Sequence, residues 1–333
     1  MAVSKKNKVL GIGSPILDIL VNVDDAFLSK ISGKKGGMEL VSSDTLDGIL
    51  SRTESDPVRA PGGSSANTIV GLTRLGMSTA FLGKIGYDAD GKFYQDNYRG
   101  MGGDLSCFRL SSTAHTGRCL SLVTPDSERT MRTDLGAAAQ LSTDDLSADC
   151  FAQASHVHLE GYLLYGGPEL VRRALTLARQ EGCTVSLDLS SFEAVRHSKA
   201  LLPEICRMGV DIIFANEDEA RELCGEMSPE DYAMKLSEYS PVVAVKLGKK
   251  GCCLRADGKT VSVPALLVEA VDTTGAGDLW QSGFLYAWLN KCPLPVCGQY
   301  GSLLGAEVVQ VMGAAIPEKR WPEIKAKLKQ VTG

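Results

Sequence analysis

The segment VHLEGYLLYGGPELVRRALTLARQEGCTVSLDL, residues 157–189, contains a strand, a helix and a second strand in succession. The short apolar runs at 157–160 and 184–189 are typical of buried strands, whereas 168–180 places its apolar residues at helical spacing. A helical crossover of this kind joins parallel strands, because a tight turn can join only antiparallel ones. The segment therefore predicts one unit of an α/β fold.

The same alternation extends in both directions along the chain. Further strands are predicted at 9–13, 79–85, 210–215 and 242–247. Helical stretches separate these strands, and the small and apolar residues of 279–313 add two buried helices. Strands that alternate with helices predict a mostly parallel sheet with helices on both of its faces.

One region departs from this alternation. Short alternating segments at 118–123 and 129–135 flank Pro125-Asp126, a strong turn signal, and predict a hairpin. We therefore expect a small discontinuous β subdomain at about 14–60 and 104–136. The large α/β domain then comprises about 1–13, 61–103 and 137–333 of a single unit.

Composition excludes several classes of partner. The 333 residues include 35 Lys and Arg against 40 Asp and Glu, so the net charge of −5 provides no basic surface for nucleic acid. The start of the chain is broken by Pro15, Asp18 and Asn22, so we expect no secretory leader, and no apolar stretch is long enough to span a membrane. We expect a cytoplasmic protein with neither nucleic acid nor a membrane as its partner.

The cysteines and histidines are interpreted as structural residues. The ten cysteines include no C-x-x-C pair and lie mostly in apolar runs, which is typical of reduced, buried thiols in a cytosolic protein. His156 and His158 alternate along a predicted strand, and a shared metal ion is not expected there.

Two common nucleotide-binding motifs are incomplete. Gly11-Ile12-Gly13 begins like a dinucleotide fingerprint, but its third glycine position is occupied by Ile16, which disfavours a nicotinamide or flavin site. Gly258-Lys259-Thr260 ends like a phosphate-binding P-loop, but its first glycine position is occupied by Cys253.

The strongest chemical signal is D-T-T-G-A-G-D at 272–278, which lies immediately before a predicted helix. Gly275 and Gly277 let the backbone approach a ligand, and the first N–H groups of the helix can bind an anion. Asp278 fits two roles here. It can accept a proton from a hydroxyl held beside that anion, or it can cap its own helix.

A second glycine-rich loop, P-G-G-S-S-A-N at 61–67, also leads into a predicted helix. Its free N–H groups, hydroxyls and amide suit a polyhydroxylated ligand. The alternative is a tight turn followed by small residues that allow close helix packing.

Together these motifs resemble the ribokinase-like (PfkB) family of sugar and nucleoside kinases. D-T-T-G-A-G-D, G-G-S-S-A-N and G-I-G-S-P-I-L-D at 11–18 carry the resemblance. N-E-D-E at 216–219 is similar to the family's N-x-x-E element, and V-K-L-G-K-K-G at 245–251 to its nucleotide-contacting strand and loop. The resemblance implies a three-layer α/β/α fold with a small β-sheet lid, and a phosphotransferase that acts on an alcohol group.

The resemblance also implies roles for individual residues. Asp278 would be the general base that deprotonates a substrate hydroxyl as it attacks the γ-phosphate of ATP. Gly275, Ala276 and Gly277 would form the anion hole. Asn216 and Glu219 would organise Mg²⁺ and phosphate through water, although both residue types are also favoured at a solvated helix start.

Further contacts follow from the same resemblance. The nucleotide would be contacted by Asn216, Lys246, Gly248 and Gly251. The acceptor would be held by Asp18, Gly62, Gly63, Asn67 and Tyr162, the last by stacking on a base. On the lid hairpin, Arg129 would close over the transferring phosphate, whereas Arg118 and Arg132 are expected to be solvated surface arginines.

The acceptor is predicted from the opening G-S-P-I-L-D-I at 13–19, which is similar to that of adenosine-kinase-like members. The 5′-hydroxyl of adenosine is therefore the first candidate. A sugar such as fructose or ribose, and a nucleoside-binding sensor without turnover, are the alternatives. Only Arg59 lies near the 62–67 loop, which favours a neutral acceptor over a sugar phosphate.

Three expectations remain. Trp280 and Gln281, which follow the catalytic motif, depart from the small residues usual in the family, and Trp280 is expected to point into helix packing. Family members leave open a monovalent cation such as K⁺ as a further cofactor, and a monomer or a lid-mediated homodimer as the assembly.

Overall fold

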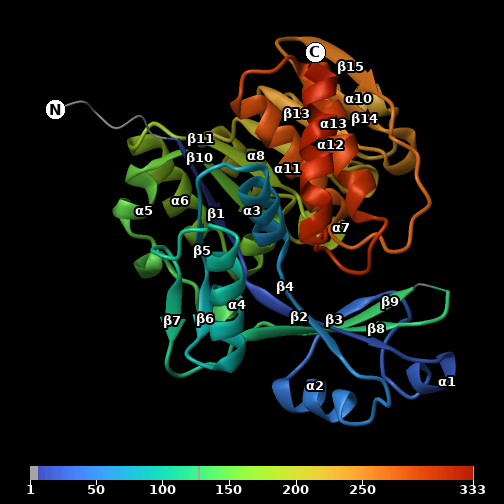
Figure 1. The fold of residues 1–333 in the computed structure, drawn as a ribbon. Coiled ribbons are helices and arrows are strands. Elements are labelled where there is room, and N and C mark those ends of the chain that lie inside the picture. The colour runs from blue at the N-terminus through green and yellow to red at the C-terminus, as the bar shows by residue number, and fades with distance from the viewer. Residues whose placement is uncertain (1–6, 127, 333) are drawn as a thin grey trace.

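The computed structural model describes residues 7–126 and 128–332, and it contains a large sheet flanked by helices (Figure 1). Its eight strands are, in spatial order, β15 (Lys259–Val263), β14 (Cys252–Ala256), β13 (Val242–Lys246), β12 (Ile212–Asn216), β11 (Thr184–Asp188), β10 (Ala154–Glu160), β1 (Lys8–Ile12) and β5 (Thr79–Leu82). Pairing is parallel from β13 to β5, and only β14 and β15 pair in the antiparallel sense. The predicted mostly parallel sheet is confirmed.

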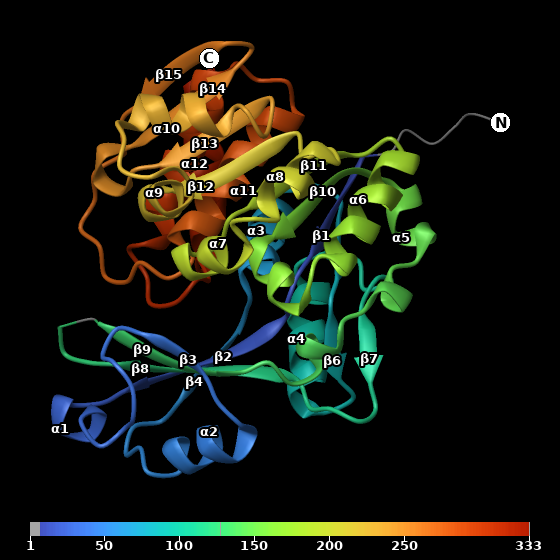
Figure 2. The ribbon, with the colours of Figure 1, turned by 180° about the vertical axis from the view of Figure 1, so that it is seen from behind.

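Helices cover both faces of this sheet, which gives the three predicted layers (Figures 1 and 2). One face packs against α5 (Ala148–Ala152), α6 (Glu169–Gln180), α7 (Phe192–Ser198), α8 (Leu202–Arg207), α9 (Glu217–Cys224) and α10 (Pro229–Leu236). The other face packs against α3 (Ser64–Leu75), α4 (Ala89–Gly100), α11 (Ala276–Leu289), α12 (Leu294–Val308) and α13 (Trp321–Thr332). None of the described helices is long and apolar enough to cross a membrane.

A second sheet of five strands lies apart from the large one, as Figure 2 shows. Its order is β3 (Met38–Leu40), β9 (Arg129–Asp134), β8 (Gly117–Val123), β2 (Ile16–Asn22) and β4 (Val58–Gly62). The β8–β9 hairpin agrees with the prediction. For residues 14–60 the sequence predicts part of a β subdomain but not the positions of its strands. This sheet corresponds to the small β-sheet lid that the resemblance implies.

The two faces of the lid sheet have different surroundings, because successive side chains of a strand point to opposite sides. Ile19 and Val21 pack against α1 (Asp25–Leu28) and α2 (Ser43–Leu50). Asp18 lies between Leu17 and Ile19 in β2 and therefore points to the opposite face. The residue bounds of both domains remain a prediction. Residues 1–6 and 333 of the large domain and residue 127 of the lid lie outside the described residues.

Residues 79–85, predicted as one strand, form two. β5 belongs to the large sheet, whereas β6 (Lys84–Gly86) pairs with β7 (Arg109–Ser111) in a separate two-stranded sheet. Gly83 separates them at a crowded point, where a β-carbon would lie 2.7 Å from both the Phe81 ring and Pro15. An apolar run does not reveal such a break.

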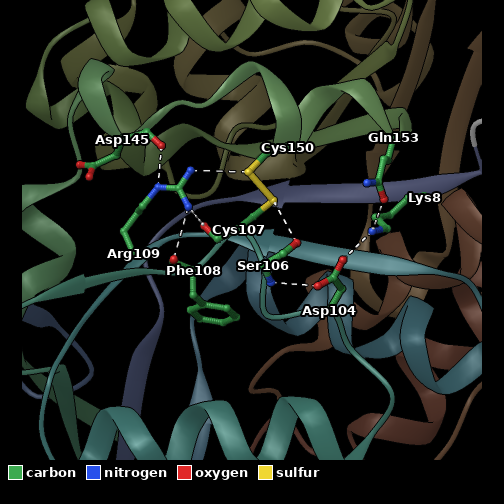
Figure 3. Close-up of a disulfide and its surroundings, with 9 residues drawn as sticks. All are labelled: Lys8, Asp104, Ser106, Cys107, Phe108, Arg109, Asp145, Cys150 and Gln153. Atoms are coloured by element: carbon green, nitrogen blue, oxygen red, sulfur yellow. Dashed lines mark hydrogen bonds and ion pairs between the residues drawn. A yellow bond between two sulfur atoms is a disulfide. The ribbon is translucent and has the colours of Figure 1, made fainter.

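The expectation of ten reduced cysteines is wrong at two positions. Cys107, just before β7, and Cys150, on α5, form a disulfide with a Cα–Cα distance of 5.8 Å (Figure 3). Arg109 donates to the carbonyls of Cys107 and Asp145 and lies 3.6 Å from Cys150 Sγ. The two cysteines are 43 positions apart, so no local spacing identifies the pair.

This disulfide predicts a redox-dependent stability. Closing a loop of this length restricts the unfolded chain, which corresponds to a stabilisation of at most about 4 kcal/mol. We expect the oxidised protein to unfold at higher denaturant concentration than the Cys107→Ser/Cys150→Ser variant. A strong dithiol reductant should abolish the difference. Identical unfolding midpoints under oxidising conditions would show that the bond does not contribute.

Candidate active site

Asp278 lies in the first turn of α11, which begins directly after Gly275. Gly275 has a φ of +68°, and a β-carbon there would lie 2.5 Å from that of Ala314, so the turn requires glycine. No side chain of the described residues caps this helix start. The positive end of the helix dipole is therefore available to an anion.

The Asp278 carboxylate contacts α3 rather than its own helix. It accepts hydrogen bonds from Ser64 Oγ at 2.8 Å and Asn67 Nδ2 at 2.9 Å. Thr68 Oγ1 donates to the Asp278 carbonyl at 3.1 Å. The role of a helix cap, which the sequence left open for Asp278, is therefore not the role seen in the structure.

The start of α3 is held close to the first crossover to the lid. Gly63 has a φ of +104°, and a β-carbon there would lie 2.2 Å from the carbonyl oxygen of Ser14. Ser64 and Asn67 are three residues apart, so they share one face of the helix. The two glycine-rich motifs, more than 200 residues apart, thus meet at one carboxylate.

Burial raises the pKa of Asp278 to about 6. The Asn67 and Ser64 hydrogen bonds and the Lys246 charge act in the opposite direction, whereas the Asp188 charge raises the pKa further. The group is therefore largely ionised at neutral pH, yet basic enough to take a proton.

A charged pair lies at the carboxyl ends of the neighbouring strands. Lys246 Nζ, at the end of β13, is 3.2 Å from Asp188 Oδ1, at the end of β11, and the two side chains are 13% and 4% exposed. Asp188 Oδ2 is also 3.4 Å from Ser64 Oγ. Asp188 was not singled out from the sequence, because a lone Asp after an apolar strand has no distinctive pattern.

Asn216 and Glu219 form a reciprocal cap at the start of α9. The Glu219 N–H donates to Asn216 Oδ1 at 2.8 Å, and the Glu219 carboxylate accepts from the Asn216 N–H and amide at 2.7 Å. Glu219 is only 1% exposed, so the alternative of a solvated helix start is wrong for this residue. Burial, followed by the Asp188 charge, raises the pKa of Glu219 to about 8.

Asp18 and Arg129 contribute the lid side. The Asp18 carboxylate lies against Gly62, where a β-carbon would be 2.3 Å from it. Burial raises the pKa of Asp18 to about 7, while the Arg129 charge lowers it and the Asp278 and Asp272 charges raise it. Arg129 Nε is 3.4 Å from Asp272 Oδ1, which joins the lid to the D-T-T-G-A-G-D segment.

Arg118 and Arg132 lie elsewhere. Arg118 donates to both carboxylate oxygens of Asp47 on α2. Arg132 is 1% exposed and donates to the Ser32 carbonyl, so its expected surface position is wrong. Arg129 and Arg132 are three residues apart on β9, so their side chains point to opposite faces of the lid sheet. Arg129 points to the face that carries Asp18, and Arg132 points to the opposite face.

Other predicted site residues have local structural contacts. The Tyr162 hydroxyl is 3.4 Å from the Ser190 carbonyl, and its ring stacks on Tyr165. Gly248 starts a short turn, and a β-carbon at Gly251 would lie 2.0 Å from the Val263 carbonyl. Their contacts with a base or nucleotide remain predictions.

Trp280 packs in the core as predicted. It is 7% exposed and stacks on Phe284, with Phe214 at its edge. His156 and His158 share hydrogen bonds with Ser186 inside the protein, which confirms their structural interpretation.

Glu160, at the end of β10, belongs to no motif that predicts a role for it. Its carboxylate accepts from the Ser14 N–H at 2.8 Å and the Ser65 N–H at 2.9 Å. Ser14 lies between β1 and β2, and Ser65 follows the return from β4 into α3. Glu160, 1% exposed, thus holds two of the chain segments that connect the lid to the large sheet.

Sequence comparison shows the family to which the chain belongs. Residues 39–321 match the pfkB family of carbohydrate kinases. The chain belongs to this family. It is a phosphotransferase that acts on an alcohol group, and PfkB kinases phosphorylate sugars or nucleosides and use ATP and Mg²⁺.

Solved structures and curated relatives agree with the PfkB assignment. An adenosine kinase from Sinorhizobium meliloti is 32% identical with a TM-score of 0.87, over 98% of this chain and 99% of that one. A probable sugar kinase from Rhizobium etli is 30% identical with a TM-score of 0.86, over 97% and 99%. A nucleoside kinase from Methanothermobacter thermautotrophicus is 29% identical over 76% of this chain and 79% of its own. The acceptor differs among these relatives.

The pKa of Asp278 predicts an acid limit to the activity of this PfkB kinase. We expect kcat/KM to fall below a pH of about 6 as the carboxylate becomes protonated. Asn67→Ala removes a hydrogen bond to the ionised carboxylate, so the limit should move to higher pH. Thr68→Val, which alters a contact with the Asp278 carbonyl instead, should leave it in place. If the acid limit of kcat/KM stays at the same pH in Asn67→Ala, the limit must arise from the protonation of a group other than Asp278.

The Glu160 contacts predict a positioning role. Glu160→Gln keeps the side-chain shape but points an amide donor at one of two N–H groups. We expect kcat/KM for the acceptor to fall by about 10-fold or more, as for a buried donor left unpaired. Far-ultraviolet circular dichroism should be unchanged. Glu204→Gln, on the exposed surface of α8, is the control, and equal effects of the two variants would contradict the role.

Proposed function

We propose that this PfkB kinase transfers the γ-phosphate of ATP to the primary hydroxyl of a neutral nucleoside, with adenosine as the first candidate. The observation that carries the proposal is the Asp278 carboxylate, held by Ser64 and Asn67 beside the uncapped start of α11. A base and an anion site next to each other are what transfer to an alcohol requires.

In this mechanism the acceptor hydroxyl attacks the γ-phosphorus while Asp278 takes its proton. The bond to the departing ADP breaks, and the N–H groups of Gly275, Ala276 and Gly277 stabilise the charge on the phosphoryl oxygens. Asp18, Gly63 and Asn67 hold the acceptor hydroxyls. Closure of the lid over them excludes water, which would otherwise compete for the phosphoryl group.

The acidic groups on the large sheet fit Mg²⁺. The described residues contain no cluster of three or more His, Cys, Asp or Glu side chains placed to hold a metal directly. Burial and the charge of Asp188 nevertheless raise the pKa of Glu219, a repulsion that a cation would relieve. Mg²⁺ prefers oxygen ligands and keeps several waters, so Asn216 and Glu219 would hold it indirectly. Bound there, it would neutralise phosphate charge.

The charges of the site support a neutral acceptor. Glu160 is a buried carboxylate and Asp18 a partly buried one near the substrate loop, and Arg129 is already paired with Asp272. A phosphate on the acceptor would meet the Asp18 carboxylate, whereas sugar hydroxyls can donate to it. The relatives include adenosine and nucleoside kinases as well as a probable sugar kinase, so a neutral sugar is the second candidate.

An ADP-release assay tests the proposal. Mg-ATP is combined in turn with adenosine, guanosine, inosine, cytidine, ribose, fructose and fructose 6-phosphate. We expect turnover with adenosine, and a loss of about 10²- to 10⁴-fold in Asp278→Asn, which keeps the shape but removes the base. Turnover with a sugar alone would overturn the nucleoside assignment. Thermal stabilisation by adenosine without turnover would favour a sensor.

A further inference from the structure

A cation from the large sheet lies against the start of α11. Lys246 ends β13 and Asp188 ends β11, with β12 between them. Neighbouring strands are about 4.8 Å apart, so the Lys246 and Asp188 side chains together bridge roughly 10 Å between the backbones of β13 and β11. The Lys246 ammonium is 3.2 Å from Asp188 Oδ1. The ion pair therefore directs the side chain of Lys246 across the end of β12.

The same ammonium touches the candidate anion hole. A β-carbon at Gly277 would lie 3.2 Å from Lys246 Nζ and 3.9 Å from its Cε, so the cation occupies the space that glycine leaves open. Asp278 is the next residue in the chain. An anion bound by the first N–H groups of α11 would therefore meet a positive charge beside the proton acceptor.

Lys246 retains its charge in this place. Burial alone would lower its pKa, but the carboxylates of Asp188, Glu219 and Asp278 outweigh burial and raise the pKa. Arg129, by contrast, lies on the lid, where it pairs with Asp272. Lys246 is placed by the large sheet, independently of the position of the lid.

We propose that Lys246 is the catalytic cation that contacts the transferring phosphoryl group, and that Asp188 is the positioning residue that holds it there. The inference rests on the proposed phosphotransfer. As the acceptor oxygen bonds to phosphorus and the bond to ADP breaks, the proton passes to Asp278 and Lys246 keeps its own. Ser64 Oγ lies 2.8 Å from the Asp278 carboxylate and 3.4 Å from the Asp188 carboxylate. It therefore links the proton acceptor to the residue that holds Lys246.

A double-mutant cycle tests this assignment. We expect Lys246→Met to lower kcat by about 10²- to 10³-fold, as for loss of one preorganised group that stabilises transition-state charge. Asp188→Asn should lower kcat by about 10-fold because the ammonium loses its anchor. The double variant should be no slower than Lys246→Met alone. Additive losses, or a kcat within threefold of wild type in Lys246→Met, would overturn the proposal.

Gly277→Ala provides a test that leaves the lysine intact. The added methyl group should displace the ammonium, which is the mobile end of a flexible side chain, and lower kcat in the wild-type background. It should have little further effect in the Lys246→Met background. Equal effects in the two backgrounds would overturn the contact between Lys246 and the anion hole.

Two comparisons separate this inference from the proposed function. Arg129→Met serves as the matched cation control, and a larger kcat loss there than in Lys246→Met would assign the catalytic charge to the lid. A wild-type protein without phosphotransfer would overturn both proposals. Wild-type turnover that Asp278→Asn abolishes, with Lys246→Met unaffected, would overturn only the role of Lys246.

Discussion

The hydrogen bonds from Ser64 and Asn67 to the Asp278 carboxylate are the contacts on which the candidate site depends. They join α3 to α11, two helices on the same face of the large sheet whose residues are far apart in sequence. Each helix begins at a glycine with a positive φ, so the carboxylate and its donors both lie at helix starts. The dipole ends of both helices thus face the same small volume.

The surrounding groups are arranged around that volume in two sets. The carboxyl ends of parallel strands contribute Asp188 and Lys246, and the first turn of α9, directly after β12, contributes Glu219. This edge is where ligands bind in open α/β sheets. The lid contributes Asp18 and Arg129. Glu160 belongs to the first set but binds the chain segments that lead to the second, so it couples the geometry of the lid to that of the sheet.

Much of the architecture could be predicted because it depends on periodic patterns. The strand–helix–strand alternation between 157 and 247 identifies the parallel sheet, and the two glycine-rich motifs identify the helix starts. What could not be predicted depends on long-range contacts. The burial of Arg132, the disulfide between Cys107 and Cys150, and the pairing of Lys246 with Asp188 each join segments well separated in the sequence. The cap formed by Asn216 and Glu219 is local, but the burial of Glu219 depends on the packing of α9 against β12 and β13.

We propose that Asp278 acts as a base in a direct, in-line transfer rather than as a nucleophile that carries the phosphoryl group. A carboxylate that already accepts two hydrogen bonds and lies beside the anion site is placed for the former role. The most direct measurement is the configuration at phosphorus, with ATP made chiral at the γ-position by oxygen isotopes and sulfur. A single in-line displacement predicts inversion in the phosphorylated acceptor. Net retention would require two displacements through a phosphorylated enzyme and would contradict the role of Asp278 as a base.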